Sequence, residues 1–273
     1  MADSGAEMYL DLLKRAVVNT LYQDPPIPTP WRTEDTFDRA ARELGRDWPS
    51  QAHSMIGFRR LENLRALLEG VLADGVPGDV LEAGVARGGA MVYARGVLRA
   101  HGVTDRTVWL ADSFQGFPEP DEHQAPDTFH PEMAEDLLRF QEVMAERAVS
   151  ADELYGQFLV GTSEAEVRDT FDRYGLLDDQ VRFIAGWFAD TLPAAPVERL
   201  AVLRVDADLY DSTQIALESL YPKVSPGGYV IIDDYQSVDQ CRRAVHDYLK
   251  SVEEDPRLVT VDEDAVYWRK ERA

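Results

Sequence analysis

Apolar positions along the chain alternate between helical and strand patterns. Helical spacing of apolar residues predicts a first helix around 9–21 and a second over 58–71. Continuous apolar runs of strand length follow at 79–85, 107–111, 181–184, 200–205 and 229–232. The helical stretches between them are 90–100, 164–174 and 212–221. Apolar strands separated by helices indicate a parallel sheet that is covered on both faces.

The two ends of the chain depart from this alternation. Prolines between 25 and 30 predict an extended connector, and a short helix is expected over 35–44. Because about 50 residues bury little core alone, we interpret 1–54 as an N-terminal helical cap on a domain spanning 55–273. Near the other end, runs at 258–261 and 265–268 predict an antiparallel hairpin. The predicted fold is therefore α/β and Rossmann-like, with the reversed final strand of class I methyltransferases.

One long connection interrupts the alternation after the second predicted strand. Residues 115–151 contain four prolines and then an acidic helical stretch near 132–147. Connections of this length often serve as lids over a site, and a solvated insertion is the alternative. His123 and His130 lie within it and could supply a base to the site.

The net charge limits the kinds of binding partner, and the cysteine content limits the kinds of structure, that the chain can have. The chain has 28 basic and 50 acidic residues, a net charge of −22. Such a surface repels phosphate backbones and anionic lipids, which argues against nucleic-acid and membrane partners. The single Cys241 excludes an internal disulfide framework. Neither a basic leader nor an apolar run of about 20 residues is evident, so we expect a cytoplasmic protein.

A glycine turn follows the first predicted strand in the sequence EAGVARGG, residues 82–89. Glycine lets the backbone approach a ligand closely, and the helix after it offers free N–H groups. The turn is neither a dinucleotide fingerprint, because Ala86 replaces the middle glycine, nor a P-loop. Glu82 suits a cationic cofactor, and Asp112 ends the next strand where an acid binds ribose hydroxyls in related folds. A purely structural glycine turn is the alternative.

Four acids follow two later strands. Asp206 and Asp208 follow one strand, and Asp233 and Asp234 follow the next. Residues two apart on a strand share a face, so Asp206 and Asp208 are expected to point together. Oxygen ligands of this kind suit Mg²⁺. The alternative is a set of surface acids and helix caps, a role we expect for Asp211 and Ser212.

Seven segments together resemble the TylF (macrocin) O-methyltransferase family, whose members methylate deoxysugars of antibiotics. These segments are SMIG at 54–57, LEAGV at 81–85, DSFQGFP at 112–118, GWFADTLP at 186–193, RVDADLY at 204–210, GGYVIIDDY at 227–235 and VYW at 266–268. The resemblance implies an enzyme that uses S-adenosylmethionine and Mg²⁺ on a small glycosylated acceptor, and we expect a homodimer. A catechol or another non-sugar diol is the alternative acceptor, while a nicotinamide-dependent oxidoreductase and a non-catalytic interaction protein are the competing classes.

The resemblance also implies residue roles. The cofactor-binding residues would be Ser54, Met55, Glu82, Gly84, Asp112, Ser113 and Trp187. The metal ligands would be Asp206, Asp233 and Asp234, with Asp208 as the general base.

Overall fold

The computed structural model describes residues 4–27, 34–116 and 162–271. All but the first two residues of the predicted lid, 115–151, lie outside the described residues, as do the acidic helix near 132–147, His123 and His130. Within the described part of the chain, no helix is long and apolar enough to cross a membrane.

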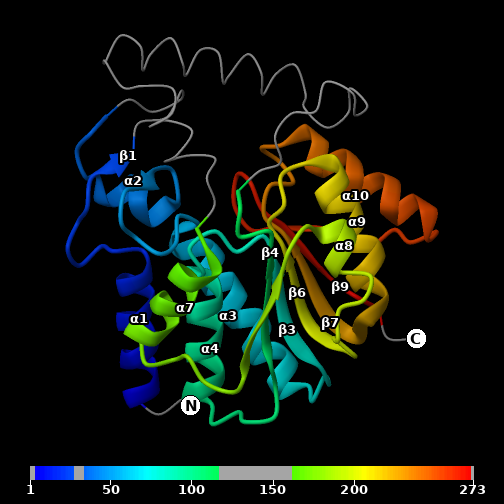
Figure 1. Ribbon diagram of the computed structural model, residues 1–273, viewed down its shortest axis with the longest axis horizontal. Helices are drawn as coiled ribbons and strands as arrows, with labels where there is room; N and C mark the ends of the chain where they lie inside the picture. The colour runs from blue at the N-terminus through cyan, green and yellow to red at the C-terminus, as the bar shows by residue number, and fades with distance from the viewer. Residues whose placement is uncertain (1–3, 28–33, 117–161, 272–273) are drawn as a thin grey trace.

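A seven-stranded sheet forms the centre of the molecule, in the order β5-β4-β3-β6-β7-β9-β8 (Figure 1). These strands are β3 (Asp79–Ala83), β4 (Val108–Asp112), β5 (Val181–Ala185), β6 (Leu200–Val205), β7 (Val224–Ile232), β8 (Val259–Thr260) and β9 (Val266–Arg269). The first five in the sheet order are parallel, whereas β9 runs antiparallel to both β7 and β8. The structure thus confirms the predicted parallel sheet with a reversed final strand and the C-terminal hairpin.

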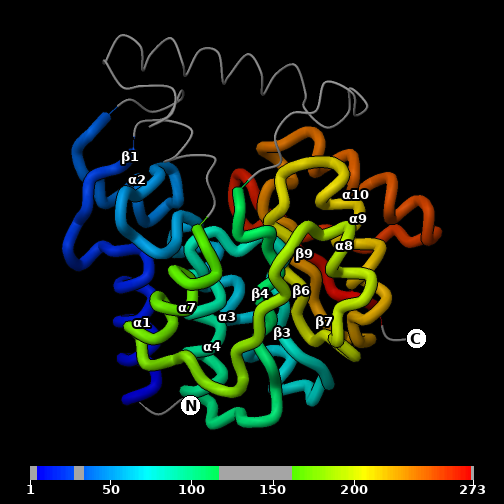
Figure 2. The backbone as a smooth tube through the Cα atoms, viewed as in Figure 1, coloured from blue at the N-terminus to red at the C-terminus, as the bar shows by residue number. Residues whose placement is uncertain are grey.

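Helices cover both faces of this sheet (Figure 2). On one face lie α3 (Gly57–Ala73), α4 (Gly89–Ala100) and α7 (Glu164–Arg173), and on the other α8 (Phe188–Thr191), α9 (Tyr210–Leu220) and α10 (Asp239–Ser251). A 3₁₀ turn, η1 (Tyr221–Lys223), joins α9 to β7. Neighbouring strand residues such as Val80 and Leu81 enter different cores, as expected when successive side chains point to opposite faces.

The N-terminal segment packs against the domain. Helix α1 (Ser4–Val17) contributes Leu10, Leu13 and Val17 to the same core as α3 and α4. After it, β1 (Pro26–Ile27) pairs antiparallel with β2 (Trp48–Pro49), a two-residue ladder too short to give a periodic signal in the sequence. Between them lies α2 (Arg39–Leu44).

Several predicted helix boundaries were wrong. The first helix ends at Val17, four residues before the expected end. Helix α2 begins at Arg39, not at 35, because the Asp38 carboxylate accepts the N–H groups of Ala40 and Ala41. Helix α9 begins at Tyr210, so Asp211 and Ser212 lie in its first turn and do not cap it.

Candidate active site

The four acids lie at the carboxyl edge of the central strands. The Asp206 N–H donates to the Ala83 carbonyl, and the Asp233 N–H donates to the Val205 carbonyl. These bonds continue the hydrogen-bond ladder of the sheet one residue beyond β6 and β7. They fix the backbone positions of Asp206 and Asp233. Carboxylate oxygens of Asp206, Asp208 and Asp234 lie within 4.8 Å of one another. The structure therefore brings three of the four predicted acids into one cluster.

Asp208 reaches that cluster through a tight turn. Strand β6 ends at Val205, so the expected strand alternation does not apply to Asp206 and Asp208. Instead the Leu209 N–H donates to the Ala207 carbonyl, and Asp208 lies between them with φ +53°. A non-glycine residue in this conformation is strained and persists only where its surroundings over-determine it. The side chains meet as predicted, but the physical reason is this turn.

Two arginines that the sequence analysis missed organise the acids. Arg204 on β6 is buried and donates to Glu82 and Asp233, and to Asp206 at 2.7 Å. Arg60 on α3 donates to the second oxygen of Asp233 at 2.6 Å. The available signal was Arg204 itself, because an arginine inside an otherwise apolar strand must be paired when buried.

The pKa values divide the acids into two groups. Burial and the nearby Asp206 and Asp233 raise the pKa of Asp208 to about 7. Burial and neighbouring carboxylates also raise the pKa of Asp206 and that of Asp234. Burial opposes ionisation of Asp233 too, yet Arg204 and Arg60 hold its pKa below the ordinary value. Each carboxylate oxygen of Asp233 thus accepts from an arginine, whereas the carboxylates of Asp206, Asp208 and Asp234 lie close to one another.

This crowding fits a bound cation. The Oδ2 atom of Asp234 is buried and has no hydrogen-bond partner among the described residues. Carboxylates this close must share a proton or neutralise their charge with a cation. Carboxylate oxygens are the hard ligands that Mg²⁺ takes in proteins. The residues present therefore fit a divalent metal in the cluster of Asp206, Asp208 and Asp234, where two carboxylates can bind the cation and the third can remain free.

The glycine turn between β3 and α4 lies directly beside the acids. Gly84 has φ +87°, and a Cβ atom there would lie 1.7 Å from the Asp206 carbonyl oxygen. Asp112 at the end of β4 accepts the N–H groups of Val85 and Phe114, both at 2.8 Å. Glu82 is buried with one oxygen on Arg204, while its Oε2 has no partner among the described residues. Glu82, Gly84 and Asp112 are thus assembled at one edge.

The remaining predicted cofactor residues approach this edge from outside the sheet. The Ser54 N–H donates to the Val17 carbonyl at 3.0 Å, and half-buried Met55 follows it. Ser113 donates to the Gly116 carbonyl at 2.9 Å. Trp187 precedes α8 with 38% of its surface exposed, and the Gly186 N–H beside it donates to the Asp112 carbonyl. The structure therefore brings Trp187 next to the strand end that carries Asp112.

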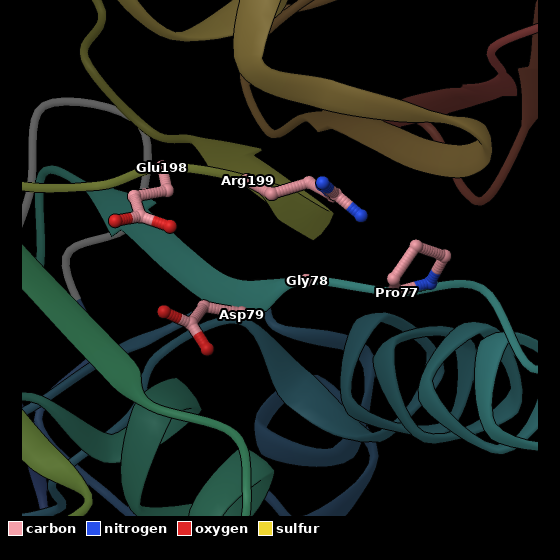
Figure 3. A pocket seen from close by; sticks show the side chains of 5 residues that line it. All are labelled: Pro77, Gly78, Asp79, Glu198 and Arg199. Carbon is pink, nitrogen blue, oxygen red and sulfur yellow. The ribbon is translucent and has the colours of Figure 1, made fainter.

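A separate hollow lies at the amino ends of the central strands, opposite the ends that carry the acids (Figure 3). It measures about 200 Å³ and is lined by Pro77, Gly78, Asp79, Glu198 and Arg199, where β3 and β6 begin. The Asp79 oxygens accept the Thr107 N–H and the Trp109 indole N–H, both at 2.8 Å. Asp79 therefore links the beginnings of β3 and β4 by hydrogen bonds, at the other end of the strands from the four acids.

Comparison with known proteins decides the family. The profile of the macrocin-O-methyltransferase (TylF) family matches residues 6–270. This chain belongs to the macrocin-O-methyltransferase family. The match confirms the resemblance seen in its sequence motifs. As a family member, the chain is an S-adenosylmethionine-dependent O-methyltransferase with the class I methyltransferase fold.

Individual members of the macrocin-O-methyltransferase family match along almost the whole chain. Mycinamicin III 3''-O-methyltransferase of Micromonospora griseorubida is 50% identical over 268 residues, 98% of each protein. Demethyldecarbamoylnovobiocin O-methyltransferase of Streptomyces niveus is 46% identical over 271 residues, 99% of this chain and 96% of that protein. The solved structure of the O-methyltransferase NovP is 46% identical to this chain and superposes with a TM-score of 0.83. The match covers 98% of this chain and 100% of the NovP chain.

Proposed function

We propose that this macrocin-O-methyltransferase family member transfers a methyl group from S-adenosylmethionine to a deoxysugar hydroxyl of a glycosylated antibiotic or its precursor, with Mg²⁺ bound. The convergence of the Asp206, Asp208 and Asp234 oxygens within 4.8 Å beside the Gly84 turn carries the proposal. The relatives support the acceptor class, since their names specify mycinamicin and novobiocin intermediates.

In this proposal Asp206 and Asp234 hold the cation. Asp233 is also a predicted ligand, but each of its oxygens accepts from an arginine, so direct binding would require one of those contacts to be exchanged. A Mg²⁺ ion held there would lower the pKa of neighbouring sugar hydroxyls. The acids also place negative charge near a sulfonium cofactor. Charge complementarity therefore favours both ligands at this edge of the sheet.

Asp208 acts as the general base. As the sugar oxygen forms its bond to the methyl carbon, the carbon–sulfur bond breaks, and the hydroxyl proton passes to an Asp208 carboxylate oxygen. Burial and the neighbouring Asp206 and Asp233 raise the pKa of Asp208, which favours the protonated product at this position.

The cofactor residues take the roles that the family resemblance implies. Glu82 and Gly84 lie beside the methionine part, and the free Oε2 of Glu82 is suited to accept a hydrogen bond there. Asp112, with Ser113 next to it, binds the ribose hydroxyls, and its backbone contacts with Val85 fix its orientation. Ser54 and Met55 would close over the cofactor, and Trp187 would lie near its adenine.

Removal of the metal tests the reaction and its cation together. We expect S-adenosylmethionine and Mg²⁺ to methylate members of a panel of glycosylated natural products, detected by mass spectrometry as the gain of one methyl group. Chelation should slow the reaction by at least about 100-fold, because charge stabilisation by a metal is worth several kcal/mol, and added Mg²⁺ should restore the rate.

Two outcomes would contradict this proposal. Methylation of simple catechols with no glycosylated acceptor accepted would favour the non-sugar diol. An unchanged rate after chelation would remove the metal from the mechanism. The predicted homodimer is a separate proposal, and light scattering of the full chain measures it directly.

A further inference from the structure

The side chain of Arg87, in the glycine turn, contacts the N-terminal segment of the chain. The turn after β3 carries Gly84 toward the acids, but the Arg87 guanidinium extends to the N-terminal segment. Its Nη1 donates to the carbonyls of Pro49 and Ala52, both at 2.9 Å. Ala86 immediately before it has φ +44°, a strained conformation for alanine. The strain and the two bonds together indicate that this orientation is maintained by the surrounding fold.

The segment that Arg87 contacts is held independently from its other side. The Asp24 carboxylate accepts the N–H groups of Gln51 at 2.6 Å and Ala52 at 3.3 Å. Buried Arg42 in turn holds Asp24 at 2.8 Å. The Val17 carbonyl accepts the N–H groups of the two residues that follow this segment, at 53 and 54. The segment therefore has a defined conformation that does not depend on Arg87 alone.

The residue that follows this segment contacts the first residue of α4. The Gly89 N–H donates to the His53 carbonyl at 2.9 Å, and a Cβ at Gly89 would lie 2.2 Å from that oxygen. Arg87 and Gly89 thus join the helix end of the turn to the stretch that leads into Ser54 and Met55. These are two of the residues that the proposed cofactor site includes.

We propose that Arg87 is a positioning residue for S-adenosylmethionine binding, clasping residues 49–52 to the turn after β3 so that Ser54 and Met55 are held over the cofactor. This inference rests on the proposed cofactor site at that turn. Pre-ordering the segment lowers the entropy that cofactor binding would otherwise lose. Because Asp24 and Val17 hold the segment from the other side, the fold persists without Arg87 while the cofactor binds more weakly.

Arg106 provides a matched control. Like Arg87 it is half-buried and donates to two backbone carbonyls, those of Gly78 at 2.9 Å and Val76 at 2.6 Å. These contacts lie at the start of β3, at the opposite edge of the sheet from the proposed cofactor site. Arg87→Met and Arg106→Met therefore remove the same kind of interaction at the two ends of one strand.

The experiment measures S-adenosylmethionine affinity by calorimetry, together with amide hydrogen exchange of residues 47–55. Arg87→Met should raise the Kd roughly tenfold to fiftyfold and speed exchange in this segment, because a charged donor to two carbonyls is lost. Arg106→Met should leave both measurements at wild-type values. Arg87→Lys keeps a charged donor on a shorter side chain, and we expect its Kd to lie between those of wild type and Arg87→Met.

Three results would overturn the inference. A wild-type Kd in Arg87→Met would show that the clasp does not serve the cofactor. An equal rise in Kd for Arg106→Met would show a general structural effect. If Arg87→Met does not fold, a wild-type Kd in a folded Arg87→Lys whose residues 47–55 exchange faster than in the wild type would also overturn it. Failure of the wild-type chain itself to bind S-adenosylmethionine would instead refute the proposed cofactor site, and the inference with it.

Discussion

Replacing Asp208 with asparagine is expected to lower the rate of methyl transfer by about 10²- to 10⁴-fold, the usual contribution of a general base. Asparagine has nearly the same shape and keeps an oxygen beside Asp206 and Asp234, but its amide cannot take the hydroxyl proton. S-adenosylmethionine affinity should therefore stay at the wild-type value. The measurements are single-turnover rates with a responsive acceptor and calorimetric titration of the cofactor.

Asp211→Asn is the control for this variant. Asp211 is exposed in the first turn of α9, three residues from Asp208, and the same charge is removed there without touching the cluster. Its rate should equal that of the wild type. Near-normal turnover of Asp208→Asn would remove Asp208 as the base, and a lost cofactor affinity would show that the residue shapes the site.

Arg204→Met is expected to destabilise the chain by about 3–5 kcal/mol, the effect of breaking a buried ion pair. Methionine fills much of the volume, but it leaves Glu82, Asp206 and Asp233 without the guanidinium that each now contacts. In a chain of this size the loss corresponds to a fall in melting temperature of roughly 10 °C. Thermal unfolding followed by circular dichroism measures it.

Arg46→Met is the corresponding surface control. Arg46 forms two hydrogen bonds with Glu263, at 2.5 and 2.6 Å, but both side chains are about half exposed. Exposed ion pairs contribute little because water screens them, so the melting temperature should scarcely change. Equal shifts in the two variants would contradict the role of Arg204 as the buried counter-charge of the acids.

The fold was largely predictable because its signals are local. Each parallel strand is an apolar run bounded by turn residues, and the helices between them follow helical periodicity. Errors fell at the ends of elements, as at Asp38, where the hydrogen bonds of one side chain decide the first helical residue, and at Asp211, which lies inside α9 and does not cap it. The β1–β2 pair escaped prediction because two residues form no periodic pattern.

The candidate site was predictable only in part. The acids could be found because the carboxyl ends of adjacent parallel strands meet at one edge. Arg204 could have been noticed as an arginine within an apolar strand, but Arg60 could not, since it lies 173 residues from its partner Asp233. Asp208 joined the cluster for a reason absent from the strand pattern, the turn with positive φ.

By itself the sequence determined the succession of strands and helices and the kinds of side chain at the strand ends. Only the tertiary structure decided which charges are paired, with Arg204 and Arg60 on Asp233 and Arg87 on the N-terminal segment. The physical reason is the separation along the chain of the residues that interact. Periodicity reflects neighbours within one or two turns, whereas an ion pair depends on which distant elements the packed sheet places side by side.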